Sequence, residues 1–187
     1  MGGGLGGGSS NAGMTLLALN QLWKLNKTDK ELEDLGAKVG ADVPFFIKGG
    51  VQLIEETGDI LTQVENCEID SYYFLLVIPS IHISTQWAYA KLNKSLEVGK
   101  SDLKFPTLSS PMKWELFDND FEQVIRKTHP EIGKIKSCLL DAGALYAGLS
   151  GSGSTVFGVF DNHQKAEALL ENFSPYQTFL SSPVFRC

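Results

Sequence analysis

The chain has 187 residues, of which 43% are hydrophobic and 20% charged, and its formal net charge is −6. This composition supports a folded core and excludes an intrinsically disordered chain. A nucleic-acid partner is disfavoured, because Asp and Glu outnumber Lys and Arg and leave no basic surface to neutralise a phosphate backbone.

The sequence predicts no membrane partner and indicates no zinc site. The longest apolar run, residues 74–79, is too short to cross a bilayer, and no signal-peptide pattern opens the chain. Its cysteines, Cys67, Cys138 and Cys187, lie far apart and indicate neither a zinc site nor a disulfide framework. Reduced thiols are typical of a cytoplasmic protein, which is the location we expect.

The chain opens with a glycine-rich tract that runs from Gly2 to Ser10. On composition alone the tract is typical of a flexible linker. The residues that follow, 12–23, predict a helix that is apolar over most of its circumference and therefore buried, with Ser9, Ser10 or Asn11 as its N-cap. A helix that starts at a glycine loop directs free N–H groups and a positive dipole end at the loop, and this arrangement binds phosphate.

A second helix is predicted to begin at the capping box formed by Thr28 and Glu31 and to end at Gly40. Its expected apolar face consists of Leu32, Leu35 and Val39.

After that helix, Pro44 is expected to hold the preceding residue in an extended conformation. This places Asp42 at the junction between a helix and a strand. Residues 51–55 and 60–64 then predict the two strands of a hairpin.

A second unit is predicted from about residue 70 onward. Residues 72–78 predict a buried strand, Ser84 or Thr85 a helix cap, and residues 95–111 a loop. Two amphipathic helices follow, the first marked by Phe117, Phe121, Val124 and Ile125 and the second by Ile132, Ile135 and Leu139. Strands at 145–149 and 156–160, a helix at 165–170 and a strand at 178–180 complete the order β, helices, β, β, α, β. That order predicts a ferredoxin-like α+β sandwich.

Three segments together resemble the motifs of the GHMP kinase superfamily. Residues 1–12 are similar to its second motif, in the long-glycine form typical of diphosphocytidyl-methylerythritol kinases. Residues 40–46, Gly-Ala-Asp-Val-Pro-Phe-Phe, resemble the segment that holds the catalytic aspartate, and residues 148–154 resemble the C-terminal glycine-rich motif. Residues 119–122, Asn-Asp-Phe-Glu, are also similar to bacterial members. The motifs occur in the expected order across nearly the whole chain.

The resemblance implies an α+β, GHMP-kinase-like fold. Residues 1–68 would form part of an N-terminal domain that is ribosomal-S5-like, and residues 69–187 a ferredoxin-like C-terminal domain. It also implies an ATP- and Mg2+-dependent kinase that phosphorylates the 2-hydroxyl of 4-diphosphocytidyl-2-C-methyl-D-erythritol in the non-mevalonate isoprenoid pathway. Family members begin with a further segment that supplies an active-site lysine, so we expect a truncated chain with weak or no activity and an uncovered apolar helix.

The resemblance assigns roles to particular residues. Asp42 would accept the proton of the substrate hydroxyl. The phosphate-binding set would be Gly2, Gly3, Gly4, Leu5, Gly6, Gly7, Gly8, Ser9 and Ser10. Substrate contact or loop support would come from Asn11, Thr85, Ser150, Gly151, Ser152 and Gly153. Without the resemblance, Asp42 is better interpreted as a capping carboxylate, and residues 150–154 are interpreted equally well as a tight turn between strands, which can also be a phosphate-facing loop.

Two alternatives remain open at this point. The chain could be another GHMP kinase, acting on mevalonate, homoserine or a sugar, although the Asp-Val-Pro-Phe-Phe segment favours the first assignment. It could also be a non-catalytic module in which the glycine tract is a linker and the ferredoxin-like half binds a partner.

Overall fold

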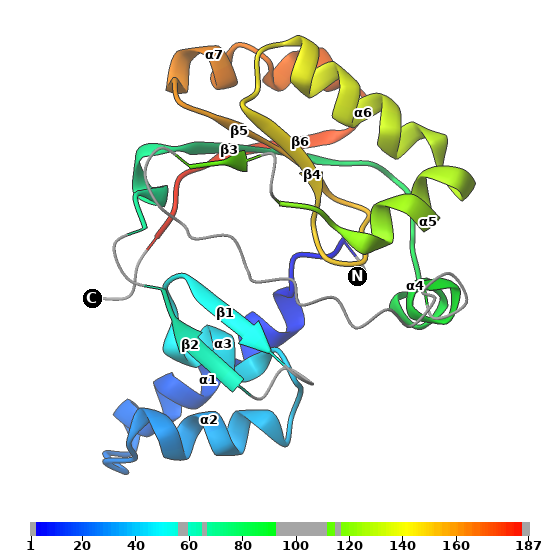
Figure 1. Cartoon of the computed structure of the whole chain (residues 1–187). Helices are drawn as coiled ribbons and strands as arrows, with labels where there is room; N and C mark the ends of the chain where they lie inside the picture. Colours follow the sequence, from blue (N-terminus) through cyan, green and yellow to red (C-terminus); the bar gives the residue numbers. More distant parts are fainter. Residues whose placement is uncertain (1–2, 56–59, 65–66, 93–111, 115–116, 185–187) are drawn as a thin grey trace. The chain divides into compact units, whose positions relative to one another are not determined.

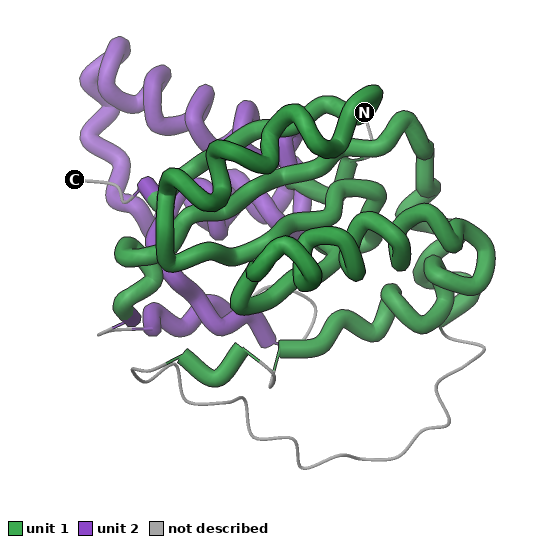
Figure 2. The backbone as a smooth tube through the Cα atoms, turned by 90° about the horizontal axis from the view of Figure 1, so that it is seen from above, with its two compact units in different colours: residues 1–5, 68–183 green, residues 6–67, 184–187 purple. Residues whose placement is uncertain are grey.

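The computed structural model describes residues 3–55, 60–64, 67–92, 112–114 and 117–184, and the chain divides into two compact units (Figures 1 and 2). Unit 1 is built from the described parts of residues 1–5 and 68–183, and unit 2 from those of residues 6–67 and 184–187. The mixture of helices and antiparallel sheets confirms the predicted α+β class.

Unit 2 contains three helices and a hairpin. Its elements are α1 (Gly7–Leu22), α2 (Asp29–Ala37), α3 (Val43–Lys48), β1 (Gln52–Glu55) and β2 (Ile60–Gln63), with β1 and β2 antiparallel. Its core is Leu32, Val43 and Ile47, each at most 2% exposed. A Cβ at Gly36 would lie 2.8 Å from Val43 Cγ1, so the glycine allows α2 to approach α3 closely.

Helix α1 differs from the prediction in its start and in its burial. It begins at Gly7 with Gly6 as the N-cap, because Gly6 adopts the left-handed conformation (φ 62°) and glycine tolerates this without strain. Ser9, Ser10 and Asn11 are therefore inside the helix. Within the described structure Gly13 is its one buried residue, while Met14 is 57% and Leu22 72% exposed. The prediction from periodicity that this helix is buried is wrong, whereas the exposed apolar side chains agree with the uncovered helix expected from the resemblance.

Helix α2 confirms the capping box and corrects the packing face. The Glu31 amide donates to Thr28 Oγ1 at 3.3 Å, and the Thr28 amide donates to Glu31 Oε2 at 2.9 Å. The helix ends at Ala37, three residues before Gly40. Leu35 and Val39 are exposed, because the contact with α3 is made through Leu32 and Gly36, one turn apart.

The segment around Pro44 is helical, which corrects the predicted strand junction. Pro44 is the second residue of α3, where its missing N–H leaves no hydrogen bond unmade. Asp42 therefore occupies the N-cap position between two helices.

Unit 1 is a four-stranded antiparallel sheet with helices on one face (Figure 1). Its strands are β3 (Tyr73–Ile78), β4 (Tyr146–Leu149), β5 (Val156–Phe160) and β6 (Gln177–Ser181), in the spatial order β4-β5-β3-β6. Central strand β3 pairs Leu75 with Gly158 on one side and with Leu180 on the other. The first strand of the unit thus lies between its third and fourth, the order of a ferredoxin-like sandwich, as predicted.

The helices of unit 1 are α4 (Thr85–Leu92), α5 (Asp120–Thr128), α6 (Pro130–Asp141) and α7 (His163–Glu167), with short 3₁₀ turns η1 (Ile69–Ser71) and η3 (Leu170–Phe173). Helix α6 packs on β4 and β5, and α7 on β3 and β5. Leu75, Leu139 and Phe160 are at most 1% exposed in this core.

Two details of unit 1 depart from the prediction, and a third prediction is not tested. Phe117 precedes α5, because Asn119 caps the helix and fixes its first residue at Asp120. The helix expected at 165–170 begins at His163 and gives way to η3. The predicted loop at 95–111 lies outside the described residues.

Candidate functional site

The first part of the glycine tract belongs to unit 1, where it lies against the turn between β4 and β5. The Thr155 amide donates to the Gly3 carbonyl at 3.1 Å, and Ser150 Oγ donates to the Gly4 carbonyl at 2.9 Å. Gly4 has a φ of 74°, and a Cβ there would lie 2.0 Å from the Ser150 carbonyl oxygen. Glycine is thus required at position 4 by backbone conformation and by space.

The turn itself contains the predicted residues of the C-terminal glycine motif. The Gly153 amide donates to the Ser150 carbonyl at 2.9 Å, and Gly151 and Gly153 both have positive φ, 53° and 87°. Ser152 Oγ lies 3.1 Å from Thr85 Oγ1 at the start of α4. The structure therefore brings together Gly3, Gly4, Thr85 and residues 150–153. Gly2 lies outside the described residues.

Thr155, which the sequence did not single out, is the fully buried residue beneath this contact. Its Oγ1 has no hydrogen-bond partner among the described residues, and a Cβ at Gly3 would lie 3.2 Å from it. A buried hydroxyl of this kind is rare. Nothing in the sequence around Thr155, which directly follows the glycine-rich turn, indicated that its hydroxyl would be buried without a partner.

The second part of the tract belongs to unit 2, where it forms the first turn of α1. Gly7 and Gly8 are exposed, and apart from their chain neighbours and the nearby backbone of α1, no atom of the described residues lies within 4 Å of a Cβ built on either. No side chain of the described residues caps the helix. The N–H groups of this first turn thus have no side-chain partner among the described residues, and the positive end of a helix dipole attracts anions.

Asp42 is exposed at the N-cap position of α3, the helix that packs against Gly13 of α1. Its backbone is in the right-handed helical region (φ −82°, ψ −10°), and its side chain makes no capping hydrogen bond in the described structure. A capping role was the main structural explanation for this carboxylate. Asp42 is thus an exposed acid that the capping role does not explain.

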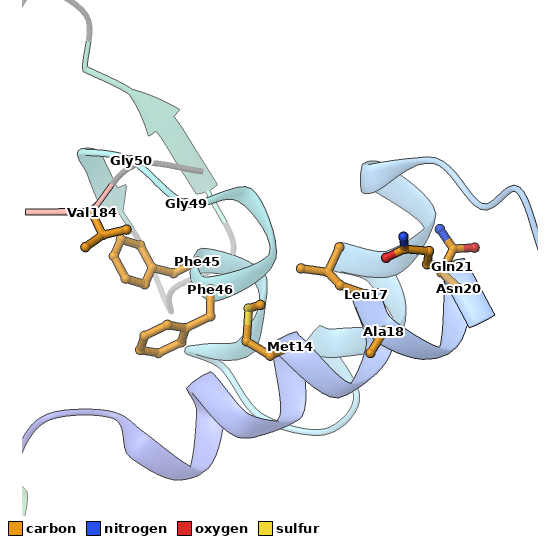
Figure 3. A pocket seen from close by; sticks show the side chains of 10 residues that line it. All are labelled: Met14, Leu17, Ala18, Asn20, Gln21, Phe45, Phe46, Gly49, Gly50 and Val184. Carbon is orange, nitrogen blue, oxygen red and sulfur yellow. The ribbon is translucent and has the colours of Figure 1, made fainter. Parts of the chain in front are cut away.

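Unit 2 also contains an apolar cavity of about 710 Å3 (Figure 3). It lies between the middle of α1 and the end of α3, where the side chain of Met14 lies beside that of Phe46. The complete lining is Met14, Leu17, Ala18, Asn20, Gln21, Phe45, Phe46, Gly49, Gly50 and Val184. Because none of these side chains is charged, the cavity offers no acid, base or phosphate-binding cation. The predicted site residues are not part of it.

The described residues contain neither a cluster of metal-binding side chains nor a membrane-spanning helix. No group of three or more His, Cys, Asp or Glu that could hold a metal ion is found there. Nor does that part of the chain contain a helix with the length and apolarity needed to cross a bilayer.

Known proteins are similar to this chain in sequence. The model of the GHMP kinases N terminal domain matches residues 1–50, and that of the GHMP kinases C terminal region matches residues 105–176. The 4-diphosphocytidyl-2-C-methyl-D-erythritol kinase of Thermodesulfovibrio yellowstonii is 40% identical over 94% of this chain and 64% of its own length. The enzyme of that name from Geobacter sp. is 44% identical over 89% of this chain and 59% of its own length.

Solved structures extend the comparison to the fold. A crystal structure of 4-(cytidine 5'-diphospho)-2C-methyl-D-erythritol kinase matches with a TM-score of 0.76 and 25% identity, covering 96% of this chain and 66% of that one. Homoserine kinase from Cytophaga hutchinsonii matches with a TM-score of 0.73 over 99% of this chain and 67% of that one. At 18% identity the second match shows a shared fold alone.

The ferredoxin-like sheet and the glycine tract leading into α1 thus define an α+β protein with the GHMP kinase fold. With both family models matched, and in the order of the family, the chain belongs to the GHMP kinase family. It spans 64% and 59% of the length of the two curated relatives described above.

Proposed function

We propose that this chain carries the nucleotide-binding part of an ATP-dependent kinase that phosphorylates the 2-hydroxyl of 4-diphosphocytidyl-2-C-methyl-D-erythritol. Relatives of that name at 40% and 44% identity support the substrate assignment, in preference to other GHMP kinases. The phosphates of ATP would bind the backbone of residues 2–10, and Asp42 would be the catalytic carboxylate. The domain boundary between residues 68 and 69 and the cytoplasmic location stay predictions.

The observation that carries the proposal is the pair of glycines in the first turn of α1. Glycine inside a helix costs about 1 kcal/mol relative to alanine. Gly7 and Gly8 are exposed, and beyond their chain neighbours and the nearby backbone of α1, no atom of the described residues lies within 4 Å of the position of an added Cβ. The described fold therefore gains nothing from either glycine. A ligand that must approach the backbone closely would account for both.

The chemistry follows from what each group offers. N–H groups at the start of α1 stabilise negative charge on phosphate oxygens, and the helix dipole adds to this. The net charge of −6 means that such local donors, and not the global field, must attract a nucleotide.

Asp42 would hold the acceptor hydroxyl in line with the transferred phosphoryl group. It would receive the hydroxyl proton late in a loose transition state, because a carboxylate is a weak base at neutral pH. Exposure at the helix N-terminus leaves its carboxylate accessible to a substrate.

Mg2+ takes hydroxyl and carboxylate oxygens as ligands, and Ser9, Ser10 and Asp42 of unit 2 have side chains of these kinds. When bound together with ATP, the ion supplies positive charge that offsets the negative charge of the phosphate oxygens. The hydroxyls of Ser9 and Ser10 would hold it.

The test is the affinity for Mg2+-ATP of Gly7→Ala and Gly8→Ala variants of this chain. Each should raise the unfolding free energy by about 1 kcal/mol, because alanine is the better helix former. Each should also weaken nucleotide binding about tenfold or more, because a methyl group blocks approach to the N–H groups. Isothermal titration calorimetry and thermal unfolding measure both quantities.

Thr15→Ala is the matched control. Thr15 is exposed on the same helix and bonds to the Asn11 carbonyl at 2.7 Å, so its replacement should raise helix stability and leave nucleotide affinity unchanged. If the glycine variants are stabilised and bind Mg2+-ATP as tightly as the parent chain, the proposal is wrong.

A further inference from the structure

Unit 1 contains a buried carboxylate that the proposed reaction does not use. Glu122, on α5, is 5% exposed. Its Oε1 accepts a hydrogen bond at 3.0 Å from the amide of Leu149, the last residue of β4. Its Oε2 lies 2.6 Å from Nζ of Lys136 on α6. Burying a charge is costly unless it is paired, so this carboxylate must be held by both partners.

Asn119, the N-cap of the same helix, is bonded to the following turn. Its Oδ1 accepts from the Phe121 amide at 3.0 Å, which fixes the orientation of the side-chain amide. Its Nδ2 donates to the carbonyl oxygens of Leu149 at 2.8 Å and Gly151 at 2.9 Å. One side chain thus connects the start of α5 to both sides of Ser150.

These bonds take the place of a second strand neighbour. Among the described residues, β4 is the edge strand of its sheet and pairs with β5 alone. The outward backbone groups at its end are instead satisfied by Asn119 and Glu122. The beginning of α5 therefore decides where the chain leaves β4 and enters the glycine-rich turn.

The turn between β4 and β5 is in turn hydrogen-bonded to the start of the chain, so the placement of the turn affects the placement of Gly3 and Gly4. Ser150, between the two residues that Asn119 holds, donates to the Gly4 carbonyl, and Thr155 donates to the Gly3 carbonyl. Figure 1 shows this turn next to the beginning of the described chain. Because Gly4 and Gly151 have no side chains, the spacing between the two backbones depends on these bonds and on the placement of the turn.

We propose that Asn119 and Glu122 are positioning residues of the kinase: they set the course of Gly3 and Gly4, the start of the phosphate-binding tract, through the turn at residues 149–153. This proposal rests on the proposed function, because it assigns the purpose of the positioning to nucleotide binding. Neither residue contacts the nucleotide in this scheme.

The experiment compares Asn119→Ser with Asn162→Ser. Serine is a good N-cap, so each variant keeps its helix start, but serine at 119 is too short to reach the turn. Asn162 caps α7 in the same way, with Oδ1 accepting from the Lys165 amide at 3.0 Å. In the part of the chain that the structure describes, Asn162 makes no hydrogen bond to the turn. Asn162→Ser therefore measures the effect of replacing an asparagine cap by serine, without any loss of bonds to the turn. Amide hydrogen exchange at Thr155, whose N–H bonds to Gly3, and the affinity for Mg2+-ATP are the two readouts.

Asn119→Ser should speed exchange at Thr155 about tenfold, because two hydrogen bonds that hold the turn are lost. It should weaken Mg2+-ATP binding by a similar factor. Asn162→Ser should leave both readouts within about twofold of the parent chain. Asn119→Asp keeps the cap and sets a carboxylate against two carbonyl oxygens, so its effect should be larger.

Unchanged exchange at Thr155 in both Asn119 variants overturns the positioning role. If amide exchange at Thr155 is faster but the affinity for Mg2+-ATP equals that of the parent chain, the positioning does not serve nucleotide binding. If neither the parent chain nor any variant binds Mg2+-ATP, the proposed function fails, while the exchange data still decide whether α5 positions Gly3.

Discussion

A Cβ built on Gly4 would lie 2.0 Å from the carbonyl oxygen of Ser150, well inside any allowed contact, and Gly4 has a φ of 74°. An added Cβ would therefore clash with a backbone atom, and not with a flexible side chain that could move aside. We expect Gly4→Ala to lower the free energy of unfolding of unit 1 by roughly 1–3 kcal/mol, through strain and the lost Ser150 bond. Denaturant unfolding measures this, and Gly7→Ala, where space is open, should show the opposite sign.

Asp42→Asn should reduce phosphoryl transfer by about 10²–10⁴-fold and leave thermal stability nearly unchanged. The reason is that the carboxylate is exposed and makes no capping bond in the described structure, so its loss affects chemistry alone. ADP release in single turnover, with the chain in excess over ATP, is the measurement. Asp34→Asn is the control, since Asp34 is an exposed partner of Lys30 on α2. Equal rates for the two variants would contradict the role of Asp42.

The capping box of α2 should make stability depend on pH at the acid end. Its bonds with Lys27 and then with the Thr28 backbone lower the pKa of Glu31 to about 2. Since a folded-state pKa is depressed, the stabilisation is present above the unfolded pKa of about 4.3 and is lost as pH falls from there through about 2. The difference in Tm between the parent chain and Glu31→Gln should be constant above pH ~5 and shrink toward pH 2. Because Glu31 is exposed, high salt should also reduce it. A difference that does not change with pH would disprove this account.

Thr155→Val should stabilise unit 1 by about 1 kcal/mol. The fully buried Thr155 Oγ1 has no partner within the described residues, and a methyl group of the same shape removes the cost of an unsatisfied hydroxyl. Denaturant unfolding tests this, with Thr178→Val as the control, because Thr178 Oγ1 donates to the Leu170 carbonyl at 3.0 Å and its loss should destabilise. Destabilisation by Thr155→Val would mean that the hydroxyl has a partner outside the described residues.

Sequence patterns correctly predicted those elements that short-range interactions stabilise. The Thr28–Glu31 capping box and the strand at 156–160 lie where the sequence placed them, because short-range hydrogen bonds and a continuous apolar run determine them. The segment at Pro44 was misjudged because a proline that breaks the interior of a helix is favourable in its first turn. The burial of α1 was also overestimated, since helix periodicity shows which face is apolar and not what covers it.

The candidate site was likewise predicted only in part. Motif resemblance pointed to Gly3, Gly4 and the 150–153 turn, and the structure places them in contact, while their roles stay predictions. Asn119 was noted in the sequence for its resemblance to relatives and not for its bonds. Its bonds to residues 149 and 151 depend on long-range packing that a single sequence does not contain.

The strand order of unit 1 also constrains how the chain can fold. Central strand β3 pairs Val77 with Thr178, near the end of the described chain, so one edge of this strand stays open until β6 has been synthesised. Non-local pairing of this kind is slow, and an apolar strand with an open edge is prone to aggregate. A nascent chain is therefore most vulnerable before β6 leaves the ribosome, and chaperones would act on it at that stage.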